Sequence, residues 1–277
     1  MAILLALGSA LAYGLSDFVG GFVSRRTSAW SVAVVAQLSA TACTCVIAMF
    51  VSGSPRWEDF AWAILAGAAS GVGSGFLYRG FASGRMSVVA PVSGVGAALV
   101  PALVGTLGGE RPSVVVWLGV LVAFPGIWLV SMSSTSMDRV AVSAGVVDGV
   151  LAGLGFGVLF ATLGQVPEQA GLWPLAAAQS LSVPTVIVLA VLLGTSWLPR
   201  GATVWWALLA GPLGATATGA FLLASQSGYL TIAGVLASLY PAITVLLAAA
   251  VLHERIHRSQ GLGLLLCAIA VGLVAGG

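Results

Sequence analysis

Ten apolar runs follow one another along the chain and are separated by short polar breaks. A helix needs about 20 mostly apolar residues to cross the hydrocarbon core of a bilayer, and each run is about that long. The breaks are rich in Arg, Ser, Gly and Pro, as expected of tight connections. The pattern therefore predicts an all-α protein with ten transmembrane helices. The runs cover residues 2–22, 30–52, 60–82, 86–108, 112–131, 142–164, 173–195, 203–224, 230–252 and 259–276.

The composition agrees with a protein that is embedded in a membrane. Of the 277 residues, 59% are hydrophobic and 6% are charged, whereas soluble domains carry about 25% charged residues. The net charge of +2 gives no reason to expect a nucleic-acid partner. The three cysteines show neither a disulfide framework nor the spacing of metal ligands. We therefore expect a lipid environment, and neither nucleic acid nor a cofactor as a partner.

The chain also matches itself at a shift of 144 residues, at which Glu110-Arg111 aligns with Glu254-Arg255. At a shift of 143 residues, Tyr13-Gly14 aligns with Phe156-Gly157. A Glu-Arg pair between apolar runs is a rare coincidence in such an apolar chain, so the match indicates two copies of a five-helix unit. Because five is odd, the second copy enters the membrane from the opposite side, as in many secondary transporters. The two copies cover residues 1–137 and 138–277.

Glycines recur at four-residue spacing in two of the predicted helices, which places each set on one helix face. Such G-x-x-x-G steps allow two helix backbones to approach closely in a membrane. We therefore expect these glycines to mark packing within the bundle, with a dimer face as the alternative. They are Gly67, Gly71 and Gly75 in the third run, and Gly149, Gly153 and Gly157 in the sixth.

Residues 253–257 read His-Glu-Arg-Ile-His and match H-E-x-x-H, in which two His bind zinc and the Glu activates a metal-bound water. The first copy has Gly109-Glu110-Arg111 at the equivalent place, so Glu-Arg belongs to the repeat and the two His are local additions. The chain has no further His as a third ligand, and Arg255 and Arg258 would repel a cation. We therefore predict a polar turn at the membrane surface; an intramembrane zinc protease is the alternative.

Five stretches of the sequence carry a resemblance to a known family: AYGLSDFVGG (12–21), LYRGFASGRMSVVAPVSG (77–94), GGERPSVVVWLG (108–119), LASQSGYLTIAGVLASLYPAI (223–243) and LHERIHRSQGLG (252–263). They resemble the drug/metabolite transporter superfamily in its ten-helix form with two EamA domains. The resemblance implies alternating-access transport, with export of amino-acid-like or other small organic solutes or drugs, across the plasma or inner membrane. It also implies a cavity lined by helices 1, 3, 4, 6, 8 and 9, with helices 5 and 10 at the periphery.

Polar side chains and prolines inside the runs are the candidates for the expected cavity. Proline removes a backbone donor, which a transmembrane helix tolerates where the freed carbonyl faces protein or water. The helix-break candidates are Pro91, Pro101 and Pro241. The candidates for substrate binding or coupling are Tyr13, Asp17, Tyr78, Arg79, Ser93, Gln226, Ser238 and Tyr240. We expect no catalytic residue and no metal ligand.

Asp17 and Arg79 are the two charges that lie most clearly inside apolar runs. Both runs end on the same side of the membrane, so we expect the two charges at similar depth. A charge at the centre of a transmembrane helix costs about 2.5–3.5 kcal/mol, and such groups tend to pair. We therefore expect an Asp17–Arg79 ion pair for which substrate or a proton competes, leaving Arg79 to hold an anionic group. Many members of the superfamily that the chain resembles carry Asn where Asp17 falls.

The charge distribution and the resemblance predict opposite orientations. Eight of the ten Arg lie in or near loops that follow odd-numbered helices. The positive-inside rule makes that side cytoplasmic and both termini external, whereas the resemblance implies termini in the cytosol. Within the transporter reading, the substrate, a proton or ion for coupling, and the choice between monomer and homodimer stay open. A channel is a further alternative.

Overall fold

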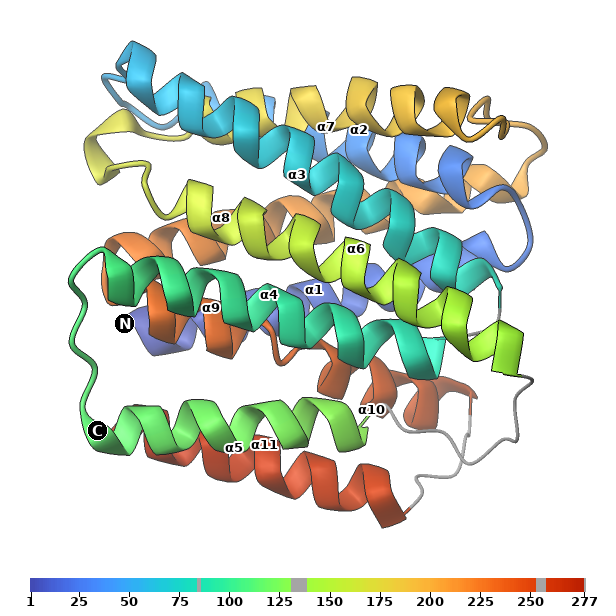
Figure 1. Cartoon of the computed structure of the whole chain (residues 1–277). Helices are drawn as coiled ribbons and strands as arrows, with labels where there is room; N and C mark the ends of the chain where they lie inside the picture. Colours follow the sequence, from blue (N-terminus) through green and yellow to red (C-terminus); the bar gives the residue numbers. More distant parts are fainter. Residues whose placement is uncertain (84–85, 131–138, 253–257, 277) are drawn as a thin grey trace.

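The computed structural model describes residues 1–83, 86–130, 139–252 and 258–276. Every regular element in these ranges is a helix, and they contain no β-strand, which confirms the predicted all-α class. Figure 1 shows a bundle whose helices run along a common axis. The elements are α1 (Ala2–Ser24), α2 (Ala29–Ala48), α3 (Trp57–Ala82), α4 (Met86–Leu107), α5 (Val114–Val130), α6 (Arg139–Leu163), η1 (Glu168–Ala170), α7 (Trp173–Leu192), η2 (Thr203–Leu209), α8 (Ala210–Gln226), α9 (Leu230–Ala237), α10 (Tyr240–Leu252) and α11 (Arg258–Gly276).

The helices account for the ten predicted membrane spans. Six spans are long and apolar enough to cross a bilayer, and they correspond to α1, α2, α3, α6, α7 and the continuous segment of η2 and α8. Shorter apolar stretches in α4, in α5, across α9 and α10, and in α11 make up the other four. The chain is therefore a multi-pass membrane protein.

The ninth span, predicted as one helix over 230–252, is divided into α9 and α10 by Ser238 and Leu239. Pro241 has no backbone N–H and cannot bond to the carbonyl of Ala237, so the helical ladder is interrupted at this point. The fourth span differs, because α4 continues through Pro91 and Pro101. Proline therefore coincides with a helix break in the ninth span and with a continuous helix in the fourth.

The packing of the helices follows the internal repeat. Helix α4 packs on α6, and the equivalent segments α9 and α10 pack on α1. Helix α3 packs on α6 and α7, and the equivalent α8 packs on α1 and α2. Helix α5 packs on its own counterpart α11. Exchanging the two halves thus preserves the set of helix contacts, as expected for two interlocked copies of one unit.

The glycine faces pack within the bundle, as predicted. A Cβ added to Gly71 on α3 would lie 2.6 Å from Cβ of Thr185 on α7. A Cβ added to Gly153 on α6 would lie 2.9 Å from the carbonyl oxygen of Ser93 on α4. Contacts this short leave no room for a side chain, so glycine sets the spacing between these helices.

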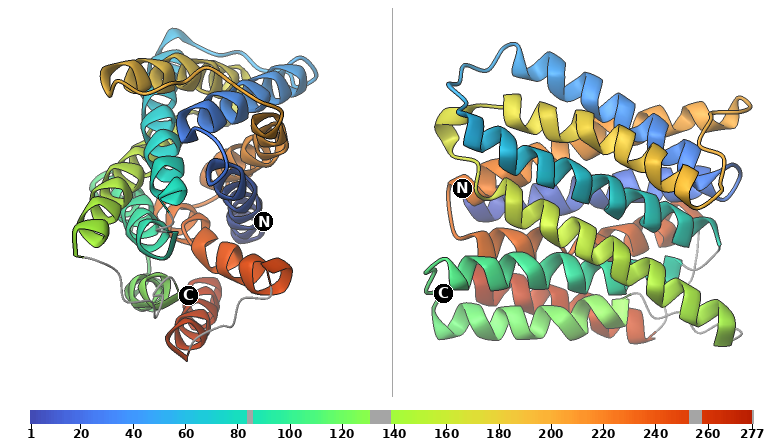
Figure 2. Two further views of the ribbon diagram at one scale, coloured as in Figure 1. Left: turned by 90° about the vertical axis from the view of Figure 1, so that its right-hand side faces the viewer. Right: turned by 45° about the horizontal axis from the view of Figure 1, so that its top comes forward.

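Helices α5 and α11 lie side by side at one edge of the bundle in Figures 1 and 2. Their contacts with α4 and α10 are much fewer than their contacts with each other. This is the peripheral position that the family resemblance implied for helices 5 and 10. The remaining spans enclose the interior of the bundle, where the cavity described below is found.

Candidate functional site

A cavity opens between the two repeats, with about 480 Å³ of empty space when its open mouth is counted. The part of this space that the centre of a water-sized sphere can occupy is about 40 Å³, so the cavity is narrow in this conformation. The wall comes from α1, α2 and α3 of the first repeat and from α6, α7 and α8 of the second. The lining residues are Tyr13, Ser16, Asp17, Ala36, Gln37, Ala40, Ser70, Ser74, Leu77, Tyr78, Phe156, Leu159, Gln179, Ala210, Gly211, Gly214 and Thr218.

Two glutamines on opposite repeats give the cavity a symmetric polar wall. Nε2 of Gln37 on α2 donates to Oγ of Ser70 and Ser74 on α3, at 3.1 Å each. Nε2 of Gln179 on α7 donates to Oγ1 of Thr218 on α8 at 2.9 Å. Ser74 and Thr218 are counterparts at the shift of 144 residues, so the two bonds are copies of one arrangement. Sequence reasoning did not select these residues, although the repeat alignment of Ser74 with Thr218 was a usable signal.

Asp17 on α1 lies in this cavity and is 5% exposed. No hydrogen bond or ion pair joins its carboxylate to another residue in the described part of the chain. Tyr78 also lines the cavity, and its ring lies directly against Gly20, where an added Cβ would be 2.5 Å from Cε1 of the ring. A carboxylate in a low-dielectric interior needs a positive partner or a proton, because water is not there to solvate it.

The position of Asp17 is where the two repeats differ. Its counterpart in the second repeat, at the shift of 143 residues, is Phe160, and the counterpart of Leu77 is Phe221. Phe160 and Phe221 stack with their ring centroids 4.3 Å apart and are fully buried. The second repeat therefore fills this place with aromatic rings, whereas Asp17 and Leu77 of the first repeat border open space.

An aromatic cluster of Tyr13, Phe156 and Tyr240 connects the cavity wall to α10 and α4. Their ring centroids are 6.2–6.4 Å apart in all three pairs. The hydroxyl groups of Tyr240 and Ser93 share a hydrogen bond of 2.6 Å between α10 and α4. The buried hydroxyl of Tyr13 has no hydrogen-bond partner. Two predicted site residues that are 147 positions apart, Ser93 and Tyr240, thus meet behind the cavity.

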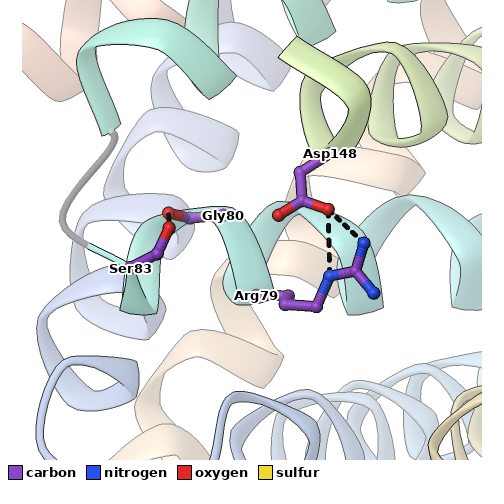
Figure 3. Close-up of polar contacts among 4 residues, drawn as sticks. All are labelled: Arg79, Gly80, Ser83 and Asp148. Atoms are coloured by element: carbon purple, nitrogen blue, oxygen red, sulfur yellow. Dashed lines mark hydrogen bonds and ion pairs between the residues drawn. The ribbon is translucent and has the colours of Figure 1, made fainter. Parts of the chain in front are cut away.

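The expected ion pair between Asp17 and Arg79 is wrong, because Arg79 pairs with Asp148 on α6. Nε of Arg79 donates to Oδ1 of Asp148 at 2.9 Å, and Nη2 contacts the same oxygen, as Figure 3 shows. The guanidinium also lies over the ring of Phe76, 4.5 Å from its centroid. Asp148 also stands inside an apolar run, so the sequence offered two acids as partners and only the packing of α3 on α6 selects one.

The other predicted residues lie outside the cavity. Nε2 of Gln226 donates to the carbonyl of Val166 at 3.0 Å, and Oγ of Ser238 donates to the carbonyl of Val235 at 2.8 Å. Pro101 packs against Gly234 of α9, and Pro241 packs against Gly94 of α4. The side chain of Pro91 lies outside the described residues.

The cavity therefore departs from the plan that the resemblance implied. Helices α2 and α7 line it in place of α4 and of α9 with α10. The physical reason is that α4 and α10 are closed over each other by the contacts of Ser93, Tyr240 and Pro241.

The His-Glu-Arg-Ile-His stretch at 253–257 lies outside the described residues. Glu110, the repeat counterpart of Glu254, lies within the described residues, and its carboxylate binds the start of α9. Oε2 of Glu110 accepts a hydrogen bond of 2.9 Å from the backbone N–H of Thr231, and Oε1 accepts one from Leu230. In the part of the chain that the structure describes, no group of three or more His, Cys, Asp or Glu could hold a metal ion.

Comparison with known proteins identifies a family and solved structures with a similar fold. The model of the family described as "EamA-like transporter family" matches residues 1–132 and 143–276. A solved structure titled "Crystal structure of protein" has a TM-score of 0.71 to this chain and covers 99% of it, with 95% of that chain matched and 14% sequence identity. No curated protein sequence matches the chain. The likeness to the solved structure concerns the fold alone.

Proposed function

The chain belongs to the EamA-like transporter family, and from this we propose that it exports a small organic solute by alternating access, with the cavity around Asp17 as the binding site. One observation carries the proposal: a cavity between two inverted repeats holds a buried carboxylate without a protein partner in the described residues. In secondary transporters with inverted repeats, the substrate site lies at the interface between the halves.

The aromatic cluster serves as the closed gate in this conformation. To open the path toward α4 and α10, the rings of Tyr13, Phe156 and Tyr240 must separate and the hydrogen bond between Tyr240 and Ser93 must break. The break between α9 and α10 supplies a hinge, since helix ends and short breaks absorb the backbone rotation in such motions. The present opening of the cavity then closes as each repeat adopts the conformation that the other has in this structure.

Asp17 is the candidate for coupling transport to a proton or another cation. A carboxylate at this depth is stabilised when a positive charge binds and is destabilised when it leaves. The free energy of binding a proton or another cation at Asp17 would therefore differ between the two states of the cycle. Such a difference is what couples transport to the bound cation. Arg79 takes no part in this step, because Asp148 already neutralises it.

Counterflow in liposomes tests the proposal. Purified protein is reconstituted with a trapped unlabelled solute, and uptake of the same labelled solute is followed for a panel of metabolites. Gln37→Ala, inside the cavity, is expected to reduce counterflow, whereas Gln226→Ala, which also removes a glutamine hydrogen bond but outside the cavity, is expected to leave it unchanged. Equal loss in both variants would contradict the assignment of the cavity. Inside-out and right-side-out vesicles then give the direction of transport.

A further inference from the structure

The charges around the cavity are strongly one-sided. Asp17 is the one charged residue among those that line it. Arg79 lies within the span of the lining helix α3, but its guanidinium pairs with Asp148 and lies over the ring of Phe76. The other arginines of α1–α3 lie at the helix ends, and Arg139 is the first residue of α6. The described parts of α2, α7 and α8 contain no Lys, Arg or His. Among the described residues, those that line the cavity therefore supply one negative charge and no positive charge.

Aromatic rings and oxygen acceptors surround this charge. The rings of Tyr13, Tyr78 and Phe156 line the cavity, and a cation is attracted to the faces of such rings. The Tyr13 hydroxyl is buried without a partner, so its oxygen is free to accept a hydrogen bond. Gln37 and Gln179 donate through Nε2, which leaves their amide oxygens as acceptors. An ammonium group, which has only donors, matches this set of groups.

We propose that the cavity selects a monovalent organic ammonium ion, with Asp17 as its counter-ion and the aromatic rings around its apolar part. This inference rests on the proposed transport function and names its substrate class. A metal ion fits less well, because one carboxylate with amide and hydroxyl groups lacks the several anionic ligands of a metal site. An anionic solute would meet an unneutralised carboxylate, so the expectation that Arg79 holds an anionic group is replaced.

Binding of matched probes to purified protein in lipid nanodiscs tests the charge selectivity. Phenethylamine, 2-phenylethanol and phenylacetate share one aromatic body and are positive, neutral and negative at neutral pH. Butylamine and benzyltrimethylammonium vary the apolar part of the cation. We expect at least one of the three cations to bind the wild type at least tenfold more tightly than the alcohol and the acid. Failure of all three cations to bind, or tighter binding of phenylacetate, would overturn the proposal.

Variants then locate the binding. Asp17→Asn keeps the shape of the side chain and is expected to weaken amine binding at least tenfold, whereas Asp17→Glu keeps the charge and retains binding. Glu58→Gln removes a negative charge from an exposed site on α3 and is the matched control. Circular dichroism and size-exclusion chromatography show whether each variant is folded. Unchanged amine binding in Asp17→Asn, or binding of Na⁺ alone in a salt titration at constant ionic strength, contradicts the inference.

The same variants separate this inference from the proposed function. If wild-type liposomes show counterflow of a neutral or anionic solute that Asp17→Asn retains, the protein is a transporter and the cation selectivity is wrong. If amines bind at Asp17 and none gives counterflow, the substrate class of the site holds and transport fails. Amine counterflow that is lost in Asp17→Asn and kept in Glu58→Gln supports both.

Discussion

The contact between Arg79 and Asp148 predicts a specific energetic coupling between α3 and α6. The perturbation is Arg79→Gln and Asp148→Asn, made singly and together, because each change removes a charge and keeps most of the side-chain volume. The comparison is the same cycle with Asp17→Asn in place of Asp148→Asn. Only the first cycle joins two groups that are bonded in the structure.

The expected magnitude follows from the exposure of the two side chains. Removing one partner of a fully buried pair costs about 3–5 kcal/mol, whereas an exposed pair contributes about 0–1 kcal/mol. Asp148 is 6% exposed and Arg79 is 34% exposed, so the pair lies between these limits. We expect each single change to lower the free energy of unfolding by about 1–3 kcal/mol, with a coupling of about 1–2 kcal/mol between Arg79 and Asp148.

Reversible unfolding in mixed micelles of dodecylmaltoside and sodium dodecyl sulfate measures these free energies. For Arg79 and Asp17 we expect additivity within about 0.5 kcal/mol, since groups without a shared contact act independently. Additive effects of Arg79→Gln and Asp148→Asn, together with strong coupling between Arg79 and Asp17, would refute the arrangement described above. Such a result would place Arg79 beside Asp17 and would remove the basis for the proposed selectivity of the cavity for cations.

The remaining predictions concern helix connections, packing and orientation. Glu110→Ala removes the acceptor of two amides at the start of α9 and is expected to cost about 0.5–2 kcal/mol of unfolding free energy in the same micelle assay. Gly153→Val forces a branched side chain against α4 and is expected to cost about 1–3 kcal/mol, whereas Gly272→Val, with open space around it, costs less. His253→Ala and His257→Ala are expected to leave counterflow unchanged; stoichiometric zinc in the purified protein, lost on either substitution, would contradict this. A reporter that is active only in the cytosol is expected to stay silent at both termini if arginines set the orientation, and strong activity at both ends would favour the orientation that the family resemblance implies.

The symmetry of the bundle explains how one repeat provides a binding site and the other does not. The bonds of Gln37 and Gln179 recur in both halves, so they belong to the shared architecture. Asp17 and Phe160 occupy equivalent places with opposite chemistry, a charged group beside empty space and a stacked ring. Function in such a duplicated chain is therefore best sought where the repeats depart from each other.

The amino-acid sequence by itself determined the spans and the repeat. Ten apolar runs with short polar breaks specify ten transmembrane segments, because burial of backbone polar groups in lipid enforces helices. The recurrence of Glu-Arg at 110 and 254 revealed the duplication without any structure. These features are local, or depend only on comparing the chain with itself, so no knowledge of packing was needed.

Only the tertiary structure decided which side chains meet. Arg79 had two acids within reach by sequence, and the close packing of α3 on α6 assigns it to Asp148. Pro241 follows the break between α9 and α10, whereas α4 continues through Pro101. Pro101 packs against Gly234 of α9. The cavity at Asp17 is lined by residues from six helices of both repeats, while a hydrogen bond between Ser93 and Tyr240 joins α4 to α10. Such distances between helices are set by the joint packing of residues far apart in the chain, which hydropathy along one chain does not encode.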